Sequence, residues 1–217
     1  METSPRIVFL IDERVPINRK SQTVHNICLG CLRVLTYFAN QRSQGKSSLL
    51  WGYKFFDSAA SRTDLLYRSG SFLDYKTQDF EEFENILFEK LSAEQDVSES
   101  VSHCPGYNLK IALTQVQSDF PWDRPELFSP TKKLSDARSS TKLNTANYVF
   151  LFMACPETSG LGQYSFFQSN INSESELLNQ LMPLTLHDKF IVQSRISLVW
   201  VDVRCGFQAI EVSFFRR

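Results

Sequence analysis

The sequence lacks any long apolar run. Its longest apolar stretches reach only five to seven residues in a chain of 217, whereas a membrane-spanning helix needs about 20. The first residues also lack the apolar region of a secretory signal peptide. We therefore expect neither a membrane span nor export. The five Cys are scattered and odd in number, which suits a reducing compartment such as the cytosol or the nucleus.

An excess of charge of one sign is lacking as well. The formal net charge is −1, so nothing global favours nucleic acid or a membrane surface. Residues 1–48 hold seven basic and three acidic side chains, but aromatic residues are not interleaved with them, so direct DNA binding is not favoured. Residues 78–100 differ, with eight acids and one Lys. That run predicts a solvated helix face and a loop, with an acidic docking surface as the alternative.

What the chain does contain is an alternation of short apolar runs and amphipathic stretches. The former are typical of strands buried on both faces of a parallel sheet, and the latter of surface helices. Strands are predicted at 6–12, 49–56, 148–153 and 196–202, and helices at 21–41, 78–91, 108–119, 173–182 and 187–194. This order predicts a doubly wound α/β domain over residues 1–205, with helices on both faces of the sheet. The tail, 206–217, is not assigned.

A segment without periodicity interrupts the alternation at about residues 120–145. Its three prolines exclude a regular helix or a central strand. Trp122, flanked by prolines, indicates either a loop held by a buried aromatic ring or a partner-binding peptide. Ser129 begins Ser-Pro-Thr-Lys, the form of a proline-directed kinase site with a basic residue three positions on. Phosphate there would add about −1.5 to −2 charges.

Motifs for catalysis are weak. Gly45-Lys46-Ser47 has the ending of a P-loop, but the required earlier Gly is Asn40, and the predicted helix precedes the motif instead of following it. Cys28 and Cys31 have redox- or zinc-like spacing, yet they lie on one helical stripe without a second pair, which favours packing. The three His show no triad context. We predict no catalytic residue, no cofactor and no enzyme activity.

Asp12 ends the first predicted strand. In the von Willebrand A type of α/β domain, this place carries Asp-x-Ser-x-Ser, which holds a divalent cation through oxygen ligands. Here Arg14 and Pro16 stand at the two Ser positions, and Arg14 brings a positive charge to the metal position. The sequence therefore predicts a degenerate metal site and a structural Asp12. The alternative is a cation-dependent ligand-binding domain that uses Asp12 and Asp202.

Taken together, several segments resemble the N-terminal region of the Treslin family (also called TICRR), regulators of replication origin firing. The segments are the strand ending in Asp12, LTY at 35–37, KFFDS at 54–58, FEE at 80–82, WDRPE at 122–126, SPTK at 129–132, VFL at 149–151, CP at 155–156 and WVD at 200–202. WDRPE with SPTK is the most specific pair. Order and spacing agree from about residue 6 to residue 202.

The resemblance implies a von Willebrand A-like or Ku-like α/β module in a nuclear, non-enzymatic scaffold. It implies a role in helicase activation and checkpoint control, with the partner MTBP and, after cyclin-dependent kinase action, a BRCT-repeat scaffold. Those contacts are expected mostly through regions that these residues do not include. The protein-interaction residues predicted here are Trp122, Asp123, Arg124, Pro125 and Glu126, with Ser129 as the candidate phosphorylation site.

Overall fold

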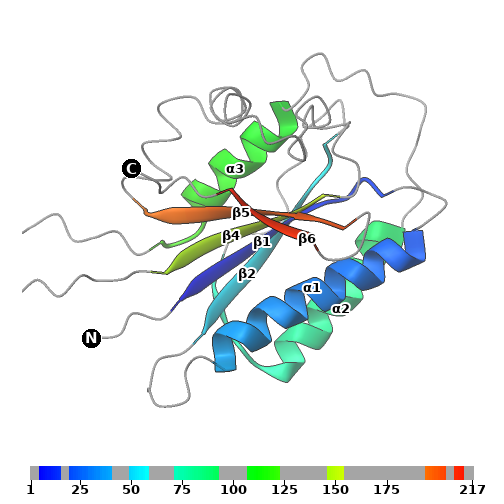
Figure 1. Ribbon diagram of the computed structural model, residues 1–217, viewed down its shortest axis with the longest axis horizontal. Helices are drawn as coiled ribbons and strands as arrows, with labels where there is room; N and C mark the ends of the chain where they lie inside the picture. Colours follow the sequence, from blue (N-terminus) through cyan, green and yellow to red (C-terminus); the bar gives the residue numbers. More distant parts are fainter. Residues whose placement is uncertain are drawn as a thin grey trace, which may run out of the picture.

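A mixed β-sheet forms the centre of the molecule (Figure 1). The computed structural model describes residues 5–15, 20–40, 49–58, 71–92, 107–122, 146–153, 194–203 and 208–212. The strands are β1 (Arg6–Asp12), β2 (Leu50–Phe56), β3 (Leu73–Asp74), β4 (Asn147–Met153), β5 (Ile196–Asp202) and β6 (Gln208–Val212), in the order β3-β2-β1-β4-β5-β6. The four central strands are parallel, and β3 and β6 pair antiparallel at the two edges.

Helices cover both faces of this sheet. α1 (Lys20–Asn40) and α2 (Thr77–Ser92) lie side by side on one face, and α3 (Tyr107–Asp119) lies on the other (Figure 1). Side chains of a strand point alternately to the two faces. Ile7, Phe9 and Ile11 therefore enter the core under α1 and α2, whereas Val8 and Leu10 enter the core under α3. Burial on both faces explains why β1 is an uninterrupted apolar run.

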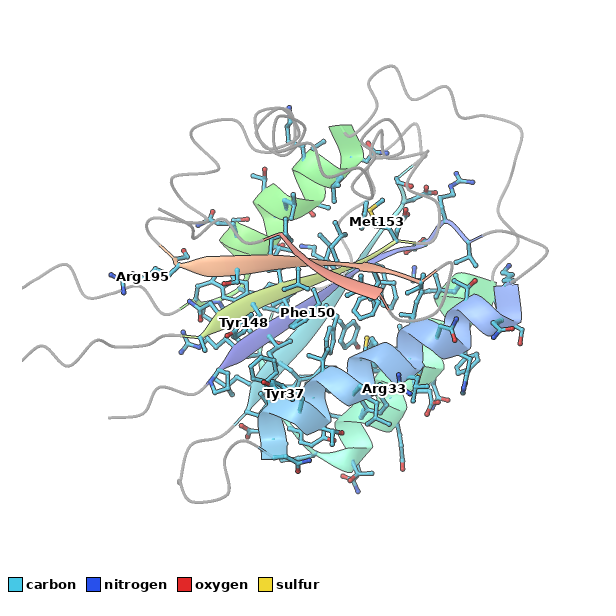
Figure 2. All side chains as sticks on the ribbon, in the orientation of Figure 1. Arg33, Tyr37, Tyr148, Phe150, Met153 and Arg195 are labelled. Carbon is cyan, nitrogen blue, oxygen red and sulfur yellow. The ribbon has the colours of Figure 1, made fainter. Side chains whose placement is uncertain are left out.

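The core under α1 and α2 is rich in aromatic rings. Phe9 lies at its centre, with its ring centroid 6.2 Å from that of Trp51 and 5.9 Å from that of Phe152. Figure 2 shows Tyr148 and Phe150 of β4 among the side chains between the sheet and α1, and the ring of Phe38 lies 4.9 Å from that of Tyr148. These contacts hold α1 against the strands at the centre of the sheet.

The α/β architecture predicted from the sequence is confirmed. The four predicted strands and three of the predicted helices form within two residues of their predicted bounds. β3 is only two residues long and was not predicted, and β6 lies in the tail that the sequence left unassigned. The helices predicted at 173–182 and 187–194 lie outside the described residues. Among the described helices, none is both long and apolar enough to cross a membrane.

Candidate functional site

The carboxyl ends of β1 and β2 place a group of polar side chains at one end of the sheet. Because β1 and β2 are parallel neighbours, with Asp12 opposite Phe56, the residues that follow each strand meet at the same edge. This is the edge at which open α/β sheets bind ligands. Asp12, Glu13 and Arg14 come from the end of β1, and Asp57 and Ser58 follow β2.

Asp12 is fully buried and joins the two strand ends. Its Oδ1 accepts hydrogen bonds from the backbone N–H of Arg14, at 3.2 Å, and of Ser58, at 3.1 Å. Its Oδ2 is buried and has no hydrogen-bond partner within the described part of the chain. Burial raises the pKa of Asp12 from 3.8 to about 7, against the opposing hydrogen bonds from Ser58 and Arg14. The prediction that Asp12 has a structural role fits these contacts.

Arg14 forms an ion pair with Asp57 across the two strand ends. Its Nε donates to Asp57 Oδ1 at 2.6 Å. The amide of Asn108, in the first turn of α3, donates to the backbone carbonyl of Asp57 at 2.9 Å. The loop after β2 is therefore held from two sides, by the loop after β1 and by the start of α3.

Glu13 extends this charged group towards α2. The backbone N–H of Glu13 donates to the carbonyl of Phe56 at 2.8 Å, and its Oε1 lies 4.0 Å from Nζ of Lys90. Burial raises the pKa of Glu13, and the charge of Lys90 opposes that shift. Sequence reasoning did not find Glu13, Lys90 or Asn108. Only polarity directly after a strand or at a helix start could have indicated them.

We call the group of Asp12, Glu13, Arg14, Asp57 and Ser58 the strand-end latch. In the parts of the chain that the structure describes, no three His, Cys, Asp or Glu side chains are grouped so that they could hold a metal ion. Asp202 ends β5, two strands away from β1 in the sheet order, or about 10 Å at the usual strand spacing. The structure therefore brings Asp12 together with Asp57 and Ser58 and not with Asp202.

The other sequence motifs have different outcomes. Cys28 and Cys31 are buried in α1, which confirms packing, and burial raises the pKa of Cys28 to about 12. A thiol with so high a pKa is a poor nucleophile. Gly45-Lys46-Ser47 lies outside the described residues.

Trp122 lies at the opposite end of α3, against the core. Its side chain is 6% exposed, and its Nε1 donates to the carbonyl of Val116 at 2.9 Å. Because α3 runs from the carboxyl end of the sheet towards its amino end, Trp122 lies near the amino ends of the strands. Of the two interpretations of Trp122, the structure shows the buried ring that holds the segment. Residues 123–126 and Ser129 lie outside the described residues, so the interaction and phosphorylation assignments stay predictions.

The rings of Phe72, Phe120 and Trp122 pack together, and we call this group the anchor. The ring of Phe72 lies 5.2 Å from that of Phe120 and 5.4 Å from that of Trp122, and the guanidinium of Arg6 lies 5.6 Å above Phe72. Phe120 also packs directly on Gly52 of β2. A Cβ at Gly52 would lie 2.5 Å from Phe120 Cε1, so only Gly allows this close approach.

Comparisons with known proteins agree with the resemblance read from the sequence. The family model "Treslin, N-terminal domain" matches residues 5–194. Treslin of Danio rerio is 28% identical over 193 residues, covering 79% of this chain and 10% of that protein. Treslin of Xenopus laevis is 25% identical over 224 residues, covering 93% and 11%.

Treslin of Mus musculus is 28% identical over 198 residues, covering 79% of this chain and 10% of that protein. The chain thus spans about a tenth of the length of these curated relatives. No solved structure matches the chain. Since the family model covers most of the sequence, including the strand-end latch and Trp122, this chain belongs to the Treslin N-terminal domain family.

Proposed function

We propose that this chain is a non-enzymatic protein-interaction module of a regulator of DNA replication initiation. The observation that carries the proposal is the family match over residues 5–194. In this proposal the module acts in the nucleus, in origin firing, helicase activation and S-phase checkpoint control. Its partners are replication-initiation proteins, with MTBP and a BRCT-repeat scaffold as the expected ones, reached mostly through regions outside this chain.

The sheet supports a von Willebrand A-like form for this module. Its order, β3-β2-β1-β4-β5-β6, places β1 at the centre and a short antiparallel β3 at one edge. Such a fold has its ligand edge where Asp12 lies. In place of a metal-binding hydroxyl, Arg14 stands in the loop after β1 and is paired with Asp57. This ion pair supports a degenerate metal site.

The segment that follows Trp122 is the proposed contact for a partner. The ring of Trp122 is buried in the core, and the four residues that follow it in the sequence, Asp123 to Glu126, are the proposed contact residues. Ser129 is proposed as a phosphorylation site for a proline-directed kinase of the cyclin-dependent class. Phosphate there would change the charge next to the two following lysines.

An affinity pull-down tests the proposal. The chain is immobilised and exposed to S-phase nuclear extract of the source organism, and the retained proteins are quantified by mass spectrometry, which also reports phosphate on Ser129. The test variant is Asp123→Ala with Arg124→Ala. The matched control is Asp74→Ala with Lys76→Ala, which removes one acid and one base from exposed positions elsewhere.

We expect replication-initiation proteins to be retained by the wild type and the control and lost with the test variant. Equal retention by all three forms would place the contact elsewhere on the domain. If none of these proteins is retained by any form, this chain is not an interaction module for them and the proposal fails.

A second candidate function is a cation-dependent von Willebrand A-like ligand binder. The observation that favours it is the buried Oδ2 of Asp12, which has no hydrogen-bond partner among the residues that the structure describes. The Arg14 guanidinium next to Asp57 opposes it, because a cation there would meet like charge. Isothermal titration calorimetry with Mg²⁺ and with ATP separates the two functions. Heat with Mg²⁺ that disappears in Asp12→Asn would favour the second, and no heat with either ligand favours the first.

A further inference from the structure

Two apolar side chains stand exposed on the helix layer formed by α1 and α2. Leu32 of α1 is 36% exposed and Phe88 of α2 is 40% exposed. Their neighbours behave differently, since Phe83, Leu87 and Leu91 of α2 are completely buried. α2 is therefore held by its inner face, whereas a large part of the Phe88 ring faces outward. In Figure 1 the two helices lie next to each other as one layer below the sheet.

Printed contacts fix how the two helices are aligned. Nζ of Lys20, at the start of α1, donates to the carbonyl of Ser92, at the end of α2, at 2.9 Å. Further along, Sγ of Cys28 donates to Oε1 of Glu84 at 3.4 Å. The helices are thus antiparallel, and the contact between Cys28 and Glu84 marks the line along which they meet.

Leu32 and Phe88 lie on opposite sides of that contact. Leu32 is four residues after Cys28, and Phe88 is four residues after Glu84, so each shares a helix face with the contact residue. Four residues rise about 6 Å along a helix, and the directions are opposite, so the two apolar side chains are separated by about 12 Å along the layer. We call the line Leu32, Cys28, Glu84 and Phe88 the α1–α2 seam.

The seam is acidic around its apolar residues. Glu84 lies within the seam, and α2 carries four further acids (Asp79, Glu81, Glu82 and Glu89). The basic residues of the two helices are Lys20, which donates to the Ser92 carbonyl, Arg33, and Lys90, which lies 4.0 Å from Glu13. Glu81 lies on the same side of α2 as Phe88, two turns earlier, and both Glu81 and Glu89 are exposed. A partner segment that covers Phe88 therefore brings its own flanking residues next to carboxylates.

We propose that the α1–α2 seam binds an amphipathic helix of a partner protein, with two apolar residues seven or eight positions apart and a Lys or Arg between them. The spacing follows from helix geometry, because about 12 Å corresponds to about eight residues at 1.5 Å each. The basic residue lies over Glu84, and the apolar residues cover Leu32 and Phe88. This is the helix-in-groove mode of peptide recognition, with charge complementarity setting the choice of partner.

The charge of the seam argues against a second copy of this chain as the occupant. In a symmetric pair of copies the acids of one α2 would face those of the other, and like charges across an interface are unfavourable. The inference rests on the proposed function, in that it gives the interaction module a second contact surface, separate from the segment after Trp122.

Fluorescence anisotropy with synthetic peptides tests the seam. The probe is a labelled, alanine-rich 16-residue helical peptide with two Leu seven positions apart and Lys at the positions between them that face the seam. A twin carries Glu in place of each Lys, and a second twin places the Leu residues five apart, on different helix sides. Titration is done with the whole chain at about 0.15 M salt, where surface charges are partly screened.

We expect the Lys probe to bind the wild type and the two twins to bind at least about tenfold more weakly. Phe88→Ala, Leu32→Ala and Glu84→Gln should each weaken binding of the Lys probe about three- to tenfold. These are exposed or half-exposed positions, and circular dichroism verifies that each variant is folded. Tyr37→Ala is the matched control, since Tyr37 is 59% exposed but packs edge-on against Phe38, away from the seam.

Several results would overturn the proposal. Equal binding of the Glu twin, or a Phe88→Ala variant that binds as the wild type does, removes its basis. Sedimentation equilibrium that shows a wild-type dimer lost in Phe88→Ala would make a second copy the occupant instead. The pull-down separates the two proposals. If the pull-down retains replication-initiation proteins while the Lys probe does not bind through Phe88, the seam fails alone, and if the wild type retains none while the Lys probe binds through Phe88, the proposed function fails alone.

Discussion

The two ends of α3 contact opposite ends of the sheet, and these two regions differ in how well their groups are satisfied. At the carboxyl end, Asn108 holds the loop after β2, next to a buried Asp12 whose Oδ2 has no hydrogen-bond partner among the described residues. At the amino end, Trp122 is buried with its side-chain N–H donating to the carbonyl of Val116. The amino-end anchor therefore stabilises the fold, whereas the carboxyl-end latch keeps an ionisable group where charge is costly.

The comparison shows that the sequence favours stability at the anchor and tolerates the free-energy cost of a buried carboxyl group at the latch. Residues that violate ordinary packing rules concentrate at functional places in proteins. The strand-end latch departs from these rules at Asp12, which lies at the edge where open α/β sheets bind ligands. The anchor obeys the rules, with rings at 5.2 and 5.4 Å and a Gly that allows the closest contact.

Removal of the anchor ring should have the largest effect. Trp122→Ala removes a buried ring and leaves the Val116 carbonyl without its donor, so we expect a loss of about 3–5 kcal/mol in the free energy of unfolding. Urea denaturation followed by circular dichroism measures it. Trp122→Phe is the matched control, since it keeps a ring and should lose about 1–2 kcal/mol. A loss below about 1 kcal/mol for Trp122→Ala would show that the anchor is not part of the core.

The latch should respond to pH with the next largest effect. The pKa of Asp12 is raised from 3.8 to about 7, so the folded chain keeps a proton that the unfolded chain releases between about pH 4 and pH 7. The contribution of Asp12 to stability is therefore lost as the pH rises through this window. Asp12→Asn keeps the shape of the side chain without the charge. We expect its stability relative to the wild type to rise by about 2–4 kcal/mol from pH 4 to pH 8.

Urea denaturation at a series of pH values measures this difference, in which the titration of other groups largely cancels. Asp74→Asn serves as the control, because it makes the same chemical change at an exposed position outside the latch. A difference between Asp12→Asn and the wild type that stays constant from pH 4 to pH 8 would contradict a buried, proton-linked carboxyl group.

The ion pair of the latch should have the smallest effect. Arg14 and Asp57 have partly exposed side chains, 15% and 27%, so their coupling energy should be about 1 kcal/mol or less. A double-mutant cycle with Arg14→Ala and Asp57→Ala measures it by urea denaturation, and 1 M NaCl should reduce it further. A coupling above about 3 kcal/mol would mean that the pair is effectively buried and is a main support of the fold.

Much of the fold could be predicted because its signals are local. The apolar run of β1 and the spacing of Phe80, Phe83 and Leu87 in α2 follow from strand and helix periodicity alone. β3 was not predicted because a two-residue strand is too short to show periodicity, and it forms only because Leu73 pairs with Trp51 of β2. β6 was not predicted because its apolar and polar residues alternate only weakly. It is recognisable as a strand only from its pairing with β5.

The candidate site could be predicted only in part. The sequence indicated Asp12 as a strand-end acid and Arg14 as a charge opposed to metal binding, and both lie at the latch. The partner of Arg14 is 43 residues away at Asp57, and no local pattern connects the two. Likewise, the choice between a held loop and a binding peptide at Trp122 depended on whether its ring was buried.

By itself the sequence determined the family, the α/β class, the strands and helices with clear periodicity, and the acidic character of α2, because each of these depends on residue type and spacing along the chain. Only the tertiary structure decided that Asp12 would be buried with one oxygen unpartnered, that Trp122 would close the core at the end of α3, and that Leu32 and Phe88 would lie on one seam. These depend on which strands and helices become neighbours, and neighbours in space are selected by packing of the whole sheet.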